Sequence, residues 1–278
     1  MASPTSKDAS IIIRPAKLSE YKILGRIASI TYFPTAFTEF LSPNRLQYYS
    51  HYERGFQKRA LILMLDLRVR SMVACEAAKP DIPIGYIHFK RLGDDQEAKR
   101  IMREKASVQL WILRWLVWAW YLLLSVVLGD KASDPKALKV FFEWVIEDGE
   151  IYWKSHKARD NQWHVQSFVV LPMFQGKGVG KRLMAEVTKR AVEENVVIGL
   201  EASPEGESFV SQLCSGSERF LCCVVMSTPG TFPQGHRERP LCCAFTSHNR
   251  TAANLLSSIE ALGLIYWASS RCIRAMNS

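Results

Sequence analysis

A glycine-rich segment between a strand-like run and an amphipathic helix constrains the fold of this chain more than any other feature. Residues 175–181 read Gln-Gly-Lys-Gly-Val-Gly-Lys; a β-branched and aromatic run (162–171) precedes them, and a helical pattern (178–195) follows. Alternating glycines at a helix start let backbone N–H groups converge on one point without Cβ interference, and free helix amides favour an anion. With a further strand-like run at 196–202, the sequence predicts a strand, phosphate-binding loop, helix and strand.

Two common phosphate-binding loops do not fit this segment. A P-loop needs glycine where Gln175 stands, and Ser or Thr where Arg182 stands. A dinucleotide-binding fingerprint needs glycine at position 181, which is Lys181. Both alternatives are therefore excluded by spacing.

From Phe168 to Met184 the chain resembles the GCN5-related N-acetyltransferase (GNAT) superfamily, through a strand, Pro172, an aromatic residue, Gln-Gly-x-Gly-x-Gly and a leucine-containing helix. The loop at 202–206 is similar to that of fungal-type members. The resemblance implies an α/β fold with a mixed, mostly antiparallel central sheet flanked by helices. It also implies an N-acetyltransferase that uses acetyl-CoA as co-substrate, without a metal, to modify a primary amine on a small molecule or peptide by direct attack.

The resemblance further implies where acetyl-CoA would lie. Its pantetheine arm would pair with the backbone of Val169, Val170 and Leu171. Its pyrophosphate would lie on the backbone amides of the loop residues Gln175, Gly176, Lys177, Gly178, Val179, Gly180 and Lys181.

Catalytic groups are harder to assign. The attacking amine must lose a proton and the departing thiolate must gain one. His164 and Gln166 share a strand face and are the candidates on the amine side, although a strand histidine beside Trp163 also suits a structural role. Glu201 and Glu205, where the next strand ends, are further candidates for the base. The family's usual acid, a tyrosine, would fall near position 210, which is Val210.

The apolar stretch 110–128 is the second prominent feature, with Arg114 and Ser125 as its strongly polar residues and four tryptophans in its first half. It is long enough to cross a bilayer. The alternatives are a helix packed on the domain surface or one lying in a membrane interface. In each membrane reading, this segment would form the membrane contact. The alternative function is that of a membrane-associated, catalytically impaired acyl-CoA-binding or scaffold protein.

The remaining patterns suggest the domain organisation. Residues 1–10 are predicted to be disordered, and 11–206 to form the acetyltransferase domain with an insertion at 93–160. Within it we expect strands at 11–15, 71–78 and 84–92, helices at 18–31, 44–66 and 135–147, and a loop around Pro34 and Pro43.

The tail, 207–278, is atypical. Residues 208–278 contain no Lys or Asp, and six of the seven cysteines lie at or after Cys214. Adjacent cysteine pairs suit zinc poorly. We predict an irregular, partly disordered segment, with 210–250 as translated intron that packs poorly, followed by a helix at 250–262 and a strand at 264–268.

Composition limits the classes of protein. With 278 residues and 48% hydrophobic residues, the chain can bury a core, which excludes a disordered polypeptide. The net charge of +9 suits either anionic ligands or a solvated surface. The polar N-terminus does not resemble a secretory signal, so an intracellular, cytoplasmic location is expected. The apolar stretch 110–128 adds membrane association as an option. We expect no nucleic-acid partner. The sequence does not indicate an oligomeric state.

Overall fold

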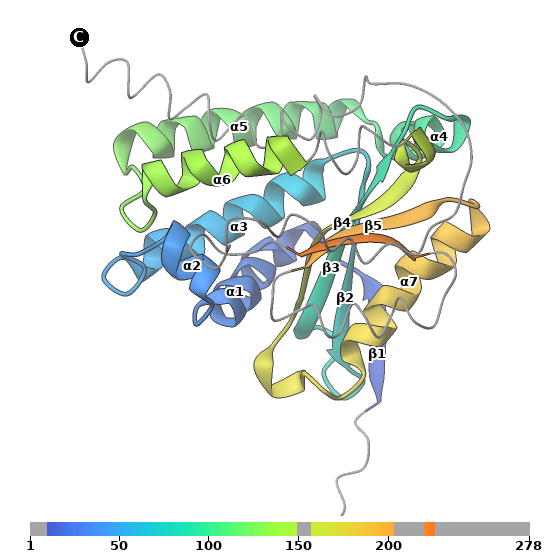
Figure 1. Cartoon of the computed structure of the whole chain (residues 1–278), viewed down its shortest axis with the longest axis horizontal. Helices are drawn as coiled ribbons and strands as arrows, with labels where there is room; N and C mark the ends of the chain where they lie inside the picture. The colour runs from blue at the N-terminus through green and yellow to red at the C-terminus, as the bar shows by residue number, and fades with distance from the viewer. Residues whose placement is uncertain (1–9, 149–156, 203–219, 226–278) are drawn as a thin grey trace, which may run out of the picture.

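The protein is built on a six-stranded sheet whose strands lie in sequence order, β1 to β6 (Figure 1). The computed structural model describes residues 10–148, 157–202 and 220–225. Strands β1 to β4 are antiparallel neighbours, whereas β4, β5 and β6 run parallel. This is the mixed, mostly antiparallel sheet flanked by helices that the sequence predicts.

The strands are β1 (Ile11–Pro15), β2 (Val69–Glu76), β3 (Pro83–Leu92), β4 (Gln162–Val170), β5 (Val197–Ala202) and β6 (Phe220–Val225). The helices are α1 (Tyr21–Tyr32), α2 (Ala36–Leu41), α3 (Tyr49–Leu65), α4 (Gln96–Lys105), α5 (Val108–Val127), α6 (Pro135–Asp148) and α7 (Val179–Glu193). Short 3-10 turns precede α1 (Leu18–Glu20), β4 (Lys157–Arg159) and α7 (Pro172–Phe174).

Helices cover both faces of the sheet. On one face α7 buries Leu183, Met184 and Val187 against Phe89 and Trp163. On the other face α1 and α3 pack against β2, β3 and β4 through the cluster Leu24, Ile27, Ala28, Ala60, Met64, Val73, Cys75, Tyr86 and Val169. Strand β3 is therefore buried on both sides over nearly its full length.

Burial of β3 forces its polar residues to find partners, because an unpaired buried charge is strongly unfavourable. Lys90, 2% exposed, pairs with Asp66 at 2.8 Å after the end of α3. Arg91 points to the opposite face and pairs with Asp95 at 2.6 Å and Glu194 at 2.7 Å. These ion pairs connect the central strand to the ends of α3 and α7.

Two sequence predictions are wrong. The loop expected around Pro34 and Pro43 contains α2, whose first turn is capped by the Thr35 hydroxyl, which accepts a hydrogen bond from the Thr38 amide. Within the tail, expected to be irregular and to pack poorly, residues Phe220–Val225 form β6 and pair with β5. A run of Phe, Leu, Cys and Val suits a strand, and the cysteine pair obscured this.

Other elements agree with their predicted positions within a few residues, including the hairpin of β2 and β3 and the unit from β4 to β5. The predicted helix 110–128 is α5, and residues 93–160 lie between β3 and β4 as α4, α5 and α6. Of the N-terminal disorder expected at 1–10, residues 1–9 lie outside the described residues, as do the helix and strand expected at 250–262 and 264–268.

The close approach of α1 to α3 at Gly25 gives a stability prediction. A Cβ on Gly25 would lie 2.5 Å from the Gln57 Cα, whereas one on Gly55 of α3 would meet nothing within 4 Å. We expect Gly25→Ala to lower the free energy of unfolding by about 1–3 kcal/mol through overpacking. Gly55→Ala should raise it by up to about 1 kcal/mol, because alanine favours the helix. Urea denaturation measures both, and equal effects would contradict the packing described.

Candidate functional site

Two glycines shape the loop that leads into α7. Gly176 has a φ of 72° and Gly178, the N-cap of α7, has a φ of 76°. Side-chain-bearing residues disfavour this left-handed region by roughly 1–2 kcal/mol, whereas glycine does not. A Cβ at either position would meet no atom within 4 Å. The glycines are therefore required by the backbone turn, and they leave open space over the helix start.

The start of α7 offers backbone donors. The first amide of this helix with an intrahelical partner is that of Arg182, which donates to the Gly178 carbonyl at 3.2 Å. The four preceding amides, Gly178 to Lys181, have no acceptor within the helix by its geometry. Together with the helix dipole and the exposed Lys181, they favour an anion such as a diphosphate.

The Arg182 side chain is less available than the sequence suggests, because its guanidinium donates to the Ile11 carbonyl of β1 at 2.9 Å. The Lys177 ammonium lies 5.4 Å from the centre of the Phe174 ring at the edge of the same loop. Of the three cations Lys177, Lys181 and Arg182, Lys181 is therefore the one best placed to contact an anion bound at the start of α7.

Strand β4 pairs with β5 along only part of its length. The register runs from Gln162 opposite Val197 to Val165 opposite Leu200. Beyond this point, among the described residues, β4 pairs with β3 alone. The two parallel strands therefore diverge, and the second half of β4 presents an open edge toward β5.

The open edge carries part of the predicted pantetheine contact. The Leu171 amide donates to the Ile84 carbonyl of β3 at 2.9 Å, so alternation along the strand turns the Val170 amide toward the open side. The Val170 carbonyl accepts a hydrogen bond from Gln175 Nε2 at 2.9 Å. The Leu171 N–H is therefore committed to β3, and the loop side chain ties the strand edge to the helix start.

Three of the predicted catalytic residues lie together where β4 and β5 diverge, and the fourth, Glu205, lies outside the described residues. His164 Nδ1 lies 2.8 Å from Gln166 Nε2, and His164 Nε2 lies 4.0 Å from Glu201 Oε1. His164 is 9% exposed. Burial lowers its pKa below the ordinary value of 6.5, partly opposed by Glu201. The imidazole is therefore neutral at neutral pH and can accept a proton.

A register shift contributes to this arrangement. Ser167 pairs with His88 and Val165 with Phe89, so Gln166 is an extra residue in β4. Such bulges redirect side chains and are frequent beside functional sites. The Gln166 carbonyl accepts a hydrogen bond from Arg59 of α3 at 3.2 Å.

Sequence reasoning missed the polar residues that continue this face of the sheet. Tyr86 and Ser167 hydroxyls lie 3.1 Å apart, and His88 Nδ1 lies 2.7 Å from Ser71 Oγ. Burial lowers the pKa of His88 to about 3 and raises that of Tyr86. The alternation of Tyr86, His88 and Lys90 in a buried strand was the available signal. The position expected for the tyrosine acid, Val210, lies outside the described residues.

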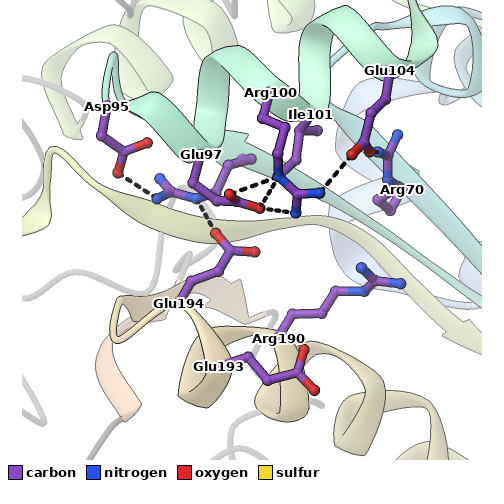
Figure 2. Close-up of a pocket in the computed structure, with 10 residues that line it drawn as sticks. Arg70, Asp95, Glu97, Arg100, Ile101, Glu104, Arg190, Glu193 and Glu194 are labelled. Atoms are coloured by element: carbon purple, nitrogen blue, oxygen red, sulfur yellow. Dashed lines mark hydrogen bonds and ion pairs between the residues drawn. The ribbon is translucent and has the colours of Figure 1, made fainter.

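A separate charged pocket of about 390 Å³ lies between α4 and the C-terminal end of α7 (Figure 2). Its arginines and carboxylates are largely paired with one another, including Arg91 with Asp95 and Glu194, and Arg100 with Glu97 and Glu104. It lies about 22 Å from the glycine loop, the length of a 15-residue helix at roughly 1.5 Å per residue. This pocket is a structural ion-pair network.

One residue of that network, Glu194, lies beside the end of β4 that is paired with β5. Glu194, just after α7, accepts hydrogen bonds from Arg91 of β3 and from Trp163 Nε1 of β4, the latter at 3.0 Å. Its carboxylate thus links three elements at the level where β4 and β5 are still paired. Among the described residues, no group of three His, Cys, Asp or Glu side chains is placed to hold a metal ion.

We expect Glu194→Ala to lower the free energy of unfolding by about 3 kcal/mol, because it leaves the buried Arg91 with one carboxylate partner fewer. The neighbouring Glu193 is exposed, so Glu193→Ala should change stability by less than about 0.5 kcal/mol. Chemical denaturation of both variants tests this, and equal stabilities would show that the buried pair contributes little.

The fold and this site define an α/β acyltransferase. The Acetyltransferase (GNAT) family model matches residues 132–207, which include β4, the glycine loop, α7 and β5. The match begins within the segment 93–160 that the sequence suggested as an insertion. This match supports membership of the GNAT superfamily.

Solved acetyltransferase structures are similar to the chain at low identity. A GCN5-related N-acetyltransferase from Ralstonia eutropha is 12% identical, with 84% of this chain and 99% of that chain covered and a TM-score of 0.41. Arylalkylamine N-acetyltransferase 2 from Aedes aegypti is 14% identical, with 73% and 81% covered and a TM-score of 0.43. A predicted acetyltransferase from Clostridium acetobutylicum, solved with acetyl-CoA, is 9% identical, with 81% and 95% covered and a TM-score of 0.36. No curated protein sequence matches the chain.

Proposed function

We propose that the protein is an N-acetyltransferase that transfers the acetyl group of acetyl-CoA to a primary amine by direct attack. The observation that carries this proposal is the arrangement along β4. Its first half brings His164 beside Gln166 and Glu201, its second half has an open edge, and the loop that follows it starts α7 with free amides. One strand thus connects a proton acceptor to an anion-binding helix start.

The residues at the open end of β4 suit acetyl-CoA. The amides at the start of α7 and Lys181 would bind its pyrophosphate, over a turn in which Gly176 and Gly178 leave room for it. The extended pantetheine arm carries amide groups, and the free edge from Phe168 to Val170 would pair with them as another strand does. Leu171 would contribute its side chain, because its amide donates to Ile84 and its carbonyl accepts from the Phe174 amide.

His164 would act as the base. Acetyl-CoA supplies the thioester, and the amine nitrogen forms a bond to the acetyl carbon while the carbon–sulfur bond breaks and one proton leaves the nitrogen. His164 would accept that proton at Nδ1, directly or through water, in place of the hydrogen bond from the Gln166 amide N–H. Glu201 would stabilise the resulting imidazolium, and water would protonate the departing CoA thiolate.

The alternative is an acyl-CoA-binding or scaffold protein that is membrane-associated and catalytically impaired. The exposed apolar helix α5 favours membrane association, but it does not distinguish an active enzyme from an inactive one. The two functions differ in turnover. Release of CoA with any member of an amine panel supports the enzyme, whereas tight acetyl-CoA binding without CoA release supports the alternative.

Binding of acetyl-CoA should depend on Gly178. Gly178→Glu places a carboxylate at the helix start and a side chain at a positive φ, so we expect the Kd for acetyl-CoA to rise about tenfold or more, measured by calorimetry. Gly129→Glu is the matched control, because Gly129 also has a positive φ, 62°, with no atom within 4 Å of its Cβ position. The control should bind within about twofold of wild type. Equal losses in both variants, or no binding by wild type, would refute the assignment of the loop.

The pH profile should report His164. Its lowered pKa means that the neutral, proton-accepting form prevails down to below pH 6.5, the ordinary value, so kcat/KM should fall only on the acid side of that value. Removing the Glu201 charge in Glu201→Gln should move this limb to lower pH, because Glu201 raises the His164 pKa.

Replacement of the base itself completes this test. His164→Gln should lower kcat by about 10²-fold to 10⁴-fold and abolish the acid limb, while acetyl-CoA affinity stays close to wild type. His51→Gln on α3, outside the cluster, is the control and should leave the profile unchanged. An unaltered acid limb in His164→Gln would show that another group is the base.

A further inference from the structure

Helix α5 is a long apolar helix on the outside of the protein. It has 20 residues, a mean hydropathy of 1.8, and no residue that is fully buried. The sequence between Lys105 and Asp130 has no acidic residue, and Arg114 is the one charged residue of the helix. An apolar surface of this length is unusual for a soluble domain and marks an interaction site.

The helix has two different sides. The half-buried side faces the protein, where Lys58 of α3 lies with its ammonium 5.2 Å from the centre of the Tyr121 ring. The outer side carries large apolar side chains that are about half exposed or more: Trp111, Ile112, Trp115, Leu116, Trp120, Leu123, Val126 and Val127. We call these eight residues the outer stripe.

Both ends of α5 are attached to the same folded body. Lys105, three residues before the helix, donates to the carbonyls of Met64 at 2.7 Å, Asp66 at 2.7 Å and Val69 at 3.1 Å. After the helix, the Asn44 amide donates to the Ala132 carbonyl at 3.2 Å.

A second bond on that side joins the Asp134 amide to the Leu41 carbonyl at 2.9 Å. A spanning helix would place its two ends on opposite sides of a bilayer, about 30 Å apart. With both ends bonded to the body, α5 cannot span a bilayer while the domain stays folded.

We propose that the outer stripe lies flat in the interface of a phospholipid bilayer, with α5 parallel to the membrane plane. Tryptophan suits this depth, because its ring is apolar and its N–H reaches the headgroups. The domain beneath α5 takes the place of the polar face that a surface helix needs. Arg114 is exposed, and its long stem lets the guanidinium extend toward lipid phosphates.

The charge around the stripe favours a lipid surface over a protein partner. The outer stripe offers no carboxylate, amide or hydroxyl with which a protein interface would form specific hydrogen bonds, apart from the indole N–H groups. The segment 105–129 carries two cations and no anion, and the chain carries a net charge of +9. Both features favour the negative surface of an anionic bilayer.

This orientation leaves the acetyl-CoA loop in water. In Figure 1, α5 lies along the upper edge of the molecule, and the turn between β4 and α7 lies at the lower edge. A bilayer bound by α5 therefore does not cover the glycine loop. Membrane binding and acetyl-CoA binding are thus expected to be independent, so that the failure of one does not imply the failure of the other.

Flotation of the full chain with vesicles tests the proposal. We expect it to float with vesicles of phosphatidylcholine and phosphatidylglycerol, and less with phosphatidylcholine alone. The stripe variant combines Trp115→Ser, Leu116→Ser, Trp120→Ser and Leu123→Ser. Its Kd for the vesicles should rise about tenfold or more, because four exposed apolar side chains are lost. The matched control, Ile82→Ser with Val192→Ser, removes exposed apolar residues elsewhere and should bind as wild type.

Two measurements separate the remaining outcomes. Four of the eight tryptophans lie in α5, so lipid-borne quenchers near the headgroups should quench fluorescence more than quenchers at the acyl-chain ends. Stronger quenching by the deep label would overturn the flat orientation. No flotation, equal flotation of the stripe variant, or a stripe-dependent dimer in lipid-free sedimentation would overturn lipid as the partner. Circular dichroism and an unchanged Kd for acetyl-CoA establish that the stripe variant is folded.

Discussion

The divergence of two parallel strands governs the rest of this structure. Strands β4 and β5 are paired over four positions, from Gln162 to Val165. At that paired end, Glu194 after α7 accepts hydrogen bonds from Arg91 of β3 and Trp163 of β4. The open edge of β4, the cluster around His164 and the start of α7 all depend on this geometry.

The two faces of the sheet play different parts around this divergence. The face covered by α7 is a dry core of Ile, Leu, Phe, Trp and Val, which positions the helix start against the end of β4. The face covered by α1 and α3 mixes apolar residues with Tyr86, His88, Lys90 and His164, all nearly inaccessible to water. Burial keeps both histidines neutral, because the charged form loses more solvation than its neighbours return. This face is therefore the one suited to proton transfer.

The local unit from β4 to β5 could be predicted because its signals are local. The β-branched run, Pro172, the alternating glycines and the spacing of four in α7 act within some forty residues. The sequence predicts that His164 and Gln166 share a strand face and that Glu201 ends the next strand. The extra residue at Gln166, which depends on pairing with β3, could not be read from β4 alone.

The two wrong predictions concern elements that do have local signals. Helix α2 lies between two prolines that suggested a loop, although Thr35 is a good N-cap residue. Strand β6 lies in the cysteine-rich tail, whose unusual composition suggested irregular structure, although the residue types of Phe220–Val225 favour a strand. The contacts of Arg59, Tyr86 and His88 require the packing of α3 on β3, which no local pattern encodes.

The bond between Gln175 and the Val170 carbonyl bears on how ligands are received. It joins the last residue of the strand edge to the first residue of the glycine loop, so the segments that would hold the two ends of one long ligand are mutually fixed. Such preorganisation means that little backbone entropy is lost when the ligand arrives. The conformational entropy lost on binding is then mainly that of the flexible ligand. The affinity for the ligand should therefore depend more on the stiffness of the ligand than on the motion of the loop.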